Sequence, residues 1–314
     1  MATYLGRNSA VGLGEESTWG SAVSRTAWRP LNSSSLLRQA TFVPRPDLKS
    51  DATSAMRRGH YQSEETMTGT FEIAATYDNI GMILKHALGS VASSGSGPYT
   101  YTYTLAAAPP TGLTIETVRG TSGNSEVFEG CKISSMTMSV NAGECMMLSC
   151  DIIGQTSAAR GSAGTPSYSG NENLVEASHA GQLSFNSVNY DLSSFTLTVN
   201  NSLDRRQLLG SVETSEPLRT DFMSVELSFE IEAVDTLYTA LLANTQGDAV
   251  VTFTGPSSRT MAFTIQNFYL NAVTDEISDA GIVTASCSGV GESDGTDQGL
   301  KIVVVNQNNS AVGN

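Results

Sequence analysis

Strict alternation of apolar and polar residues constrains this chain more than any other feature of its sequence. The clearest run covers residues 223–232, where apolar side chains alternate with Ser and Glu. The same period of two occurs at residues 98–105, 133–140, 194–200 and 261–270. Because successive side chains of a strand point to opposite faces, this period predicts strands with one buried and one polar face. The polar faces are rich in hydroxyls, since the chain holds 41 Ser and 33 Thr among 314 residues.

Charge excludes several classes of partner. The net charge is −14 and the pI is about 4.6, whereas a protein that grips phosphates needs a basic patch. An anionic membrane surface is disfavoured for the same reason, and the apolar runs fall short of the roughly 18–20 residues that span a bilayer. The first fourteen residues contain no apolar segment typical of a secretory signal, so we expect a cytosolic chain. In that reducing compartment the four cysteines are expected to be buried free thiols.

Two short segments have helical spacing instead. Residues 78–89 open with Asp78 as an expected N-cap and end at Gly89 as an expected C-cap. Residues 235–244 repeat this plan, with Leu237, Ala240 and Leu241 directed inward. The sequence therefore predicts one helix in each half of an otherwise β chain.

The two halves share an order of elements that indicates an internal duplication. Thr70-Phe-Glu-Ile73 precedes the first helix and Ser228-Phe-Glu-Ile231 precedes the second, 158 residues later. Each half also carries a long polar segment before that strand and a closing pair of strands ending near Cys150 or Cys287. We therefore predict two modules, residues 1–157 and 158–314, joined through the Ser-, Gly- and Ala-rich stretch 155–181.

Candidate catalytic motifs fail on their context. Gly291, Ser293 and Gly295 match the spacing of a nucleophile elbow, but that motif requires a helix after the Ser and a His later in the chain. His60, His86 and His179 all precede it. The acidic turn 294–298 lacks the closing Glu of a calcium loop, and the histidines show no metal-ligand spacing. We expect neither an enzyme nor a cofactor nor a bound metal.

Two longer motifs resemble those of bacteriophage tail tube proteins. Residues 12–23, GLGEESTWGSAV, are similar to the N-terminal signature of that family. Residues 127–155 are similar to its second signature, in which Gly130 enters a long strand and Gly143-Glu144 forms a hairpin tip. The likeness is weaker in the second half, where Asp275-Glu276 takes the place of the Gly-Glu tip.

This resemblance implies the major tail tube protein of a phage with a long non-contractile tail. It implies a mainly β fold of two tandem tail-tube-type β-sandwich modules, each with one flanking α-helix. The inner sheets of neighbouring modules would merge into a ring barrel, and stacked rings would form a conduit for double-stranded DNA that passes without specific binding. The implied location is the virion tail, assembled in the host cytoplasm. Implied partners are further copies, adjacent rings, the tape measure protein and the tail terminator, with no membrane.

An acidic inner wall of the tube would explain the negative charge of the chain, because like charges repel and the DNA phosphates would not be trapped on the wall. Residues 1–157 carry 11 basic and 13 acidic side chains, and residues 158–314 carry 6 and 18. The period of two predicts that Glu226, Glu230 and Glu232 face the lumen, and the matching strand of the first half presents Thr68, Thr70 and Glu72. The alternative is that the excess carboxylates only aid solubility.

The long polar segments, residues 43–64 and 202–221, exceed what a hairpin connection needs. Their paired arginines on an acidic protein suggest docking arms, so we predict that Arg57, Arg58, Arg205 and Arg206 contact carboxylates of the adjacent ring. The alternative is a pair of flexible loops with solvated charges.

Other readings remain open at this point. The chain could be another tail ring component, such as a terminator or a distal tail protein. It could also be a β-sandwich carbohydrate binder or adhesin, for which Trp19, Trp28 or the row Tyr99, Tyr101 and Tyr103 would be the binding platform. If six modules surround the axis, a chain that supplies two modules forms a trimeric ring with pseudo-sixfold symmetry, and a chain that supplies one module forms a hexamer. The internal duplication favours the trimer.

Overall fold

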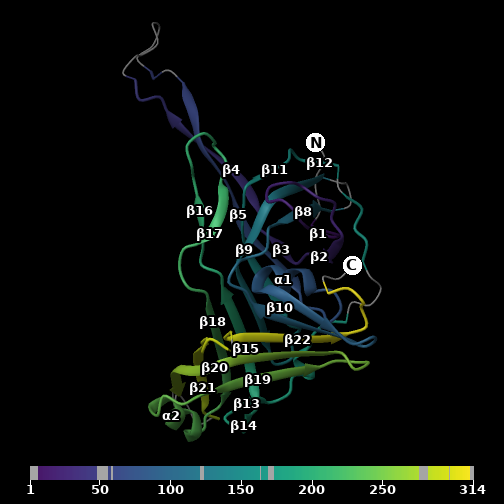
Figure 1. Cartoon of the computed structure of the whole chain (residues 1–314), viewed down its shortest axis with the longest axis vertical. Helices are drawn as coiled ribbons and strands as arrows, with labels where there is room; N and C mark the ends of the chain where they lie inside the picture. The colour runs from purple at the N-terminus through teal and green to yellow at the C-terminus, as the bar shows by residue number, and fades with distance from the viewer. Residues whose placement is uncertain are drawn as a thin grey trace.

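The computed structural model describes residues 6–47, 56–57, 59–120, 124–162, 164–168, 173–275, 282–296 and 298–311. The prediction of a mainly β chain is confirmed: strands dominate, with two short α-helices among the described residues (Figure 1). The first half contains β1 (Ala10–Glu15), β2 (Ala27–Pro30), β3 (Ser33–Ser34), β4 (Leu37–Pro44), β5 (His60–Ala74), α1 (Gly81–Leu88), β6 (Gly89–Ser94), β7 (Tyr99–Leu105), β8 (Leu113–Arg119), β9 (Asn124–Asn141), β10 (Met147–Gly154) and β11 (Thr156–Ser157). The rest of the chain contains β12 (Gly161–Ser162), a 3-10 turn (Ala177–His179), β13 (Leu183–Phe185), β14 (Val188–Tyr190), β15 (Leu192–Asn200), β16 (Leu203–Arg206), β17 (Ser215–Arg219), β18 (Ser224–Glu232), α2 (Asp235–Leu242), β19 (Gln246–Thr254), β20 (Thr260–Asp275), β21 (Thr284–Gly291) and β22 (Leu300–Asn306).

One extended antiparallel sheet runs through both halves. In the first half its strand order is β4–β5–β10–β9, and in the second half it is β15–β18–β21–β20. The two groups are joined because β15 pairs directly with β9 over seven residue pairs. The sheet that carries the period-two strands is therefore continuous across the predicted module boundary.

The long strands β9 and β20 each take part in a second ladder. The N-terminal part of β9 pairs with β8, which pairs in turn with β1, and β1 pairs with β2. The N-terminal part of β20 pairs with β19, which pairs with β13, and β13 pairs with β14. Apolar residues from both kinds of ladder form one buried core that contains side chains of both halves.

The two halves agree in register as well as in strand order. Phe71 of β5 lies opposite Cys150 of β10, and Phe229 of β18 lies opposite Cys287 of β21. The next ladder is interrupted at the same place in each half, after Asp151 of β10 in the first and after Ser288 of β21 in the second. This agreement includes an irregularity that sheet formation does not require. The duplication itself stays a prediction, which we take up below.

The halves are also tied together away from the sheet. The last strand, β22, pairs with β20 on one side and with β7 of the first half on the other. Asp78 and Arg259, both almost fully buried, form an ion pair between the halves with an Nε–Oδ2 distance of 2.9 Å. Asn306 donates a hydrogen bond to the Tyr77 carbonyl oxygen across the same boundary.

The first helix begins later than predicted. The sequence predicted Asp78 as its N-cap, but α1 starts at Gly81 after the residue Ile80, which caps with no side-chain hydrogen bond. Asp78 is unavailable as a cap because its carboxylate is bound to Arg259. The end of the helix is as predicted, since Gly89 adopts a left-handed conformation with φ 109°. The second helix begins at Asp235 as predicted.

The two long polar segments were predicted as loops, which is wrong for the parts that form ladders, whereas residues 45–47 and 207–214 lie outside any strand. β4 and β5 continue pairing outward as far as Pro44 opposite His60, and β16 pairs with β17 within residues 202–221. Their Thr, Tyr, Val and Arg side chains suit a solvated ladder, in which backbone groups satisfy each other. Figure 1 shows the β4–β5 hairpin projecting beyond the rest of the chain. The stretch 155–181 also adds β11 and β12, which pair with β9.

Candidate functional site

The sheet has one polar face that crosses both halves, and we call it the polar face. Its residues lie on β5, β10, β9, β15, β18 and β21. They are Thr68, Thr70 and Glu72; Ser149 and Asp151; Ser135, Thr137 and Ser139; Ser194, Thr196 and Thr198; Glu226, Ser228, Glu230 and Glu232; and Thr284, Ser286 and Ser288. Residues directly opposite each other in an antiparallel ladder share a face, and these positions are linked partner to partner from strand to strand.

Burial confirms the alternation behind this face. On β18 the side chains of Val225, Leu227, Phe229 and Ile231 are buried. Glu226, which lies between the first two, and Glu232, which follows the last, are exposed. The same holds on β5, where Phe71 is buried between Thr70 and Glu72. The six residues predicted to face the lumen thus lie together on one side of one sheet. Whether that side faces a lumen stays a prediction.

Five of these positions are carboxylates, and none of them is Lys or Arg. Beside Thr68 the ladders continue the same face to Ile153 and Lys132, and Lys132 is buried and paired with Glu216. Asp151 is the member that the sequence analysis missed. Its two carboxylate oxygens accept hydrogen bonds of 2.6 Å from the Thr70 and Ser135 hydroxyls on the two neighbouring strands. The alternation of Asp151 with the buried residues Cys150 and Ile152 could have revealed it. Hydroxyls therefore hold at least one of the carboxylates in place.

The seam between the halves does not interrupt this face. Thr137 of β9 and Thr198 of β15 lie opposite each other, and their hydroxyl oxygens are 3.3 Å apart. A shallow hollow of about 280 Å³ opens on the second half of the face, between Thr196, Ser228 and Ser286. Hydroxyl and carboxylate groups thus line a surface that extends from β5 to β21.

The arginines predicted to dock onto an adjacent ring have partners within the chain. Arg205 Nη2 lies 2.9 Å from Glu64 Oε2, so it joins β16 to β5. Arg206 donates a hydrogen bond to the Glu216 carbonyl oxygen across the β16–β17 hairpin. Arg57 is exposed at the outer end of the β4–β5 hairpin, and Arg58 lies outside the described residues. A contact with another ring stays a prediction for all four.

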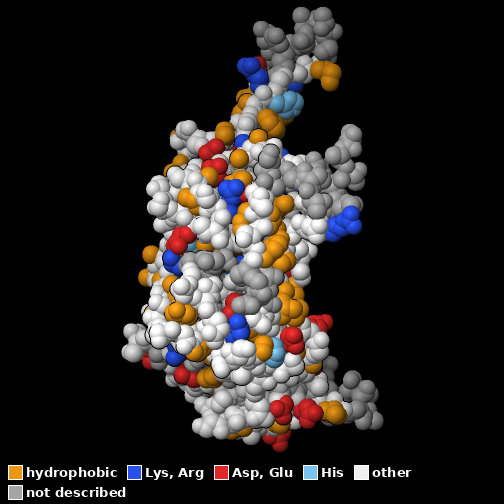
Figure 2. Space-filling view, turned by 90° about the vertical axis from the view of Figure 1, so that its right-hand side faces the viewer, with side chains coloured by type: hydrophobic (Ala, Val, Ile, Leu, Met, Phe, Trp, Pro, Cys, Tyr) orange, Lys and Arg blue, Asp and Glu red, His pale blue; other side chains and the backbone are white. Residues whose placement is uncertain are grey.

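The two hairpins form a pair of arms held against each other. The Glu65 backbone N–H of the first arm donates to the Val212 carbonyl oxygen of the second. Lys132 of β9 pairs with Glu216 of β17 at 2.7 Å and joins the second arm to the body of the sheet. Large apolar side chains stand exposed on these arms, including Phe42 and Leu209. In Figure 2 the β4–β5 arm stands apart from the body of the molecule. Exposed apolar side chains on a projecting element are typical of a contact surface.

The two family-like motifs of the first half meet in space. The buried Glu16 carboxylate accepts hydrogen bonds from the Gly130 N–H and the Thr114 hydroxyl, each at 2.9 Å. The Trp19 indole N–H donates to the Gly130 carbonyl oxygen at 3.0 Å. Gly130 has φ 63°, which favours glycine at this position. Trp19 is therefore occupied in tying β1 to β9, and does not stand free as a binding platform.

The other candidate platforms are also used internally. Trp28 is buried. In the tyrosine row, Tyr101 and Tyr103 are buried, and their hydroxyls donate to the carbonyl oxygens of Asn308 and Ala311 at 2.6 Å. These residues hold the end of the described chain against β7.

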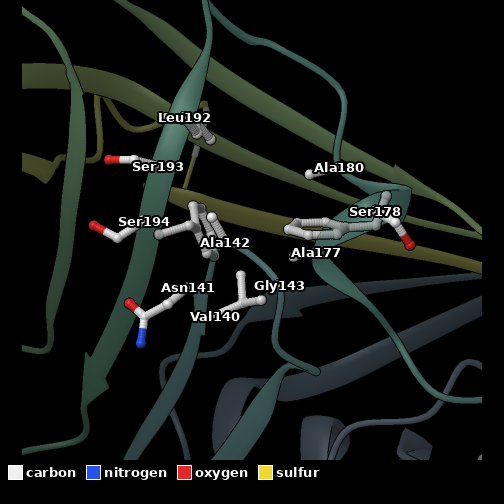
Figure 3. Close-up of a pocket in the computed structure, with 12 residues that line it drawn as sticks. Val140, Asn141, Ala142, Gly143, Ala177, Ser178, Ala180, Leu192, Ser193 and Ser194 are labelled. Atoms are coloured by element: carbon white, nitrogen blue, oxygen red, sulfur yellow. The ribbon is translucent and has the colours of Figure 1, made fainter.

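A second hollow, of about 270 Å³, lies between the β9–β10 turn, the start of β15 and the 3-10 turn Ala177–His179. Figure 3 shows that Ala142, Ala177 and Leu192 approach it, whereas the hydroxyls of Ser193 and Ser194 point away from Ala177 and Ala180. None of its lining residues is an acid, a base or a thiol. This hollow offers shape and apolar surface without groups that could perform catalysis.

The cysteines and the nucleophile-elbow match have structural roles. All four thiols are free, and burial raises the pKa of Cys287 to about 11 and those of Cys131 and Cys150 as well. A thiol is a nucleophile as its thiolate, so these groups are poorly reactive. Ser293 forms a bridge with Gln298 at a hairpin tip, where no helix follows in the described residues.

The described residues contain no group of three or more His, Cys, Asp or Glu side chains placed to hold a metal ion. Within the same part of the chain, neither helix has the length and apolar character needed to cross a membrane.

A family model described as phage tail tube protein matches residues 6–291, which is nearly the whole chain. No curated protein matches the sequence.

Proposed function

This chain belongs to the phage tail tube protein family, and we propose that it is the major tail tube protein, whose stacked rings form a conduit for double-stranded DNA. Membership of this family makes it a structural component of the virion tail. A non-enzymatic role agrees with the family.

The observation that carries the proposal is the polar face, which is continuous across both halves and whose charged groups at the named positions are all carboxylates. Lys132, which the ladders place on the same side beyond Thr68, is buried and paired with Glu216. Proteins that bind DNA gain affinity by neutralising phosphates with cations and releasing counterions. A wall that DNA must slide past needs the opposite property. Carboxylates repel the phosphates over roughly a Debye length, about 8 Å at physiological salt, and hydroxyls keep the wall hydrated.

The ring is proposed to contain two modules per chain, residues 1–157 and 158–314. Strand order, register and the shared interruption after Asp151 and Ser288 support this duplication. The β9–β15 ladder then joins two modules inside one chain, as ring closure would join modules of neighbouring chains. Three chains would close a ring of six modules with pseudo-sixfold symmetry, and rotational closure requires identical head-to-tail contacts.

The arms are proposed to contact the adjacent ring. They project from the end of the sheet at which β15 leads into β16, away from the β9–β10 turn at the opposite end. Arg205 ties the β16–β17 arm to β5, Arg206 bonds within the β16–β17 hairpin, and Arg57 stands exposed near the outer end of β4–β5. Head-to-tail stacking would bring these arms to the far end of the sheet in the next ring.

Mass measurement and negative-stain microscopy of purified protein test the assembly. We expect rings of three chains that stack into tubes. Rings of six chains would show that each chain supplies one module to the wall, and a protein that stays monomeric at high concentration would contradict the tube function.

The role of the wall is tested by replacing Glu226, Glu230 and Glu232 with Lys, which changes the charge by +6 per chain. We expect tubes that still form but that retain DNA, so genome ejection and infectivity fall. The matched control carries the same charge change outside the six strands, at the exposed residues Asp191, Asp221 and Glu292. Undiminished infectivity of the first variant would remove the support for a repulsive wall.

A further inference from the structure

The polar face ends in two open strand edges. β4 pairs with β5 on one side, and the end of β20 after Leu270 pairs with β21 on one side. The structure assigns these segments no ladder on their other sides within the described residues. Other ladders of β20 end earlier, at Ile265 with β22 and at Tyr269 with β19. An unpaired edge presents backbone N–H and C=O groups and is a template for pairing with another chain.

The internal seam shows what such edges do in this fold. β15 occupies in the second half the place that β4 occupies in the first, since each flanks the strand that carries the central Phe. β9 occupies in the first half the place of β20 in the second, since each flanks the strand that carries the central Cys. The pairing of β9 with β15 is therefore a template for pairing β20 with β4.

The ladders convert that template into a register. Thr198 lies opposite Glu226, which is three residues before Phe229. Leu37 lies opposite Thr68, which is three residues before Phe71. Leu37 therefore corresponds to Thr198. On the other strands, Met136 opposes Cys150 and Val273 opposes Cys287. The next residues, Thr137 and Thr274, therefore also correspond.

We infer that β4 of one copy pairs antiparallel with the end of β20 in a neighbouring copy, with Leu37 opposite Thr274, Arg38 opposite Val273 and Ala40 opposite Asn271. This inference rests on the proposed ring assembly and names the edges and the register through which it closes. The partner is a second copy of this chain, because the complementary edge is found on the chain itself.

Backbone polarity agrees with this register. The Ser35 N–H donates inward, to the Thr70 carbonyl oxygen of β5. Because N–H groups alternate along a strand, those of Arg38 and Ala40 point to the open side. In the template, the Asn201 N–H donates to the Ser134 carbonyl oxygen at 2.8 Å, and these residues correspond to Ala40 and Asn271.

The helices supply an independent observation. α1 buries seven of its eight residues, whereas α2 buries only Leu237. At the internal seam, Asn201 donates to the Ala87 carbonyl oxygen near the end of α1. At the open edge, the α2 side chains Tyr238 and Leu242 are 51% and 72% exposed.

Leu37 and Phe42 of β4 are 48% and 62% exposed, but they lie opposite Thr68 and Gln62 and therefore share the side of the polar face. Leu237 of α2 packs into the core on the other side of the sheet. The pairing would give α2 a neighbouring copy beside it, as Asn201 is beside the end of α1 at the internal seam, without a contact to Leu37 or Phe42.

Disulfide trapping tests the register. Thr137 and Thr198 form a non-hydrogen-bonded pair, the type in which side chains lie closest, so their counterparts should crosslink when changed to Cys. In a Cys145→Ser background, the double variant L37C/T274C should convert, on mild oxidation of assembled rings, to covalent multimers on a non-reducing gel. Each single variant should stay monomeric, and T137C/T198C should form an intrachain link as a positive control.

Three results separate this inference from the proposed function. Rings that form, with T137C/T198C linked but L37C/T274C unlinked, would overturn the register and leave the tube function standing. Wild-type chains that form no rings would overturn both. The variant A40P removes one outward N–H while sparing the β4–β5 ladder. The A40P monomer should therefore keep its melting temperature but fail to form rings. Intact rings from A40P would contradict the edge pairing.

Discussion

The buried ion pair between Asp78 and Arg259 makes the union of the two halves measurable. Arg259 Nε lies 2.9 Å from both carboxylate oxygens of Asp78, and both side chains are almost completely buried. Asn173 donates a further hydrogen bond to Asp78 Oδ2 at 2.9 Å. Asp78 precedes α1 and Arg259 precedes β20, so the pair spans the predicted module boundary. Removing one partner leaves the other charge buried with too few partners.

The expected cost follows from this burial. Breaking a buried pair by removing one partner costs about 3–5 kcal/mol. Unfolding entropy near the midpoint is about 2.1 cal/mol/K per residue, or about 0.66 kcal/mol/K for 314 residues unfolding as one unit. Asp78→Ala or Arg259→Ala should therefore lower the melting temperature by roughly 5–8 °C. The double variant should be no less stable than the worse single variant, because it buries no unpaired charge.

Differential scanning calorimetry of the unassembled chain measures this effect. We expect one transition that moves as a whole, since the halves share a core and the β9–β15 ladder. A matched control is Arg119→Ala, which removes a partly exposed guanidinium from Glu126 within the first half. The reasoning fails if either single variant melts within 1 °C of the wild type, or if the double variant's loss equals the sum of the single losses.

Two further predictions concern acid and backbone strain. Burial raises the pKa of Glu65, but hydrogen bonds from Arg38 and Thr156 outweigh it and leave that pKa below its ordinary value; for Glu126 the bonds from Arg160 and Ser157 do the same. A carboxylate whose pKa is lowered in the folded state stabilises the protein above its ordinary pKa, about 4.3, and this stability is lost as pH falls through the folded pKa. Glu65→Gln should therefore flatten the loss of stability between pH 5 and pH 2 in urea titrations. An unchanged slope would contradict this. Gly69 has φ 145°, and a Cβ there would lie 2.6 Å from the Ser35 carbonyl oxygen. Gly69→Ala should therefore lower the free energy of unfolding by about 1–3 kcal/mol in the same titrations. A neutral substitution would show that β5 can relax.

The sequence predicted the sheet well because alternation is a local property. The period of two at residues 223–232 placed Val225 and Phe229 in the core and Glu226 and Glu232 outside it, as the structure shows. Gly89 was likewise predictable as a helix C-cap, because its role depends on its own backbone. Such features need no knowledge of what lies next to the strand or the helix.

What the sequence did not reveal depended on partners far along the chain. Asp78 satisfies every local rule for an N-cap, but Arg259, 181 residues later, takes its carboxylate. Glu16 gave no signal beyond a motif, although its carboxylate joins β1 to β9 through Gly130. The arms were read as loops because residues 43–64 and 202–221 lack a compact apolar pattern, and both of their faces meet solvent or each other.

Asp151 explains why the candidate site was only half predicted. Alternation identifies which face a carboxylate occupies, and it does so for Asp151 between Cys150 and Ile152. It does not show that Thr70 and Ser135 lie on either side, because that depends on which strands pair. The two hydroxyls each donate to the carboxylate and hold it in one position on the polar face. In the proposed wall, neutral donors of this kind would position a negative charge without a cation that could also bind a phosphate.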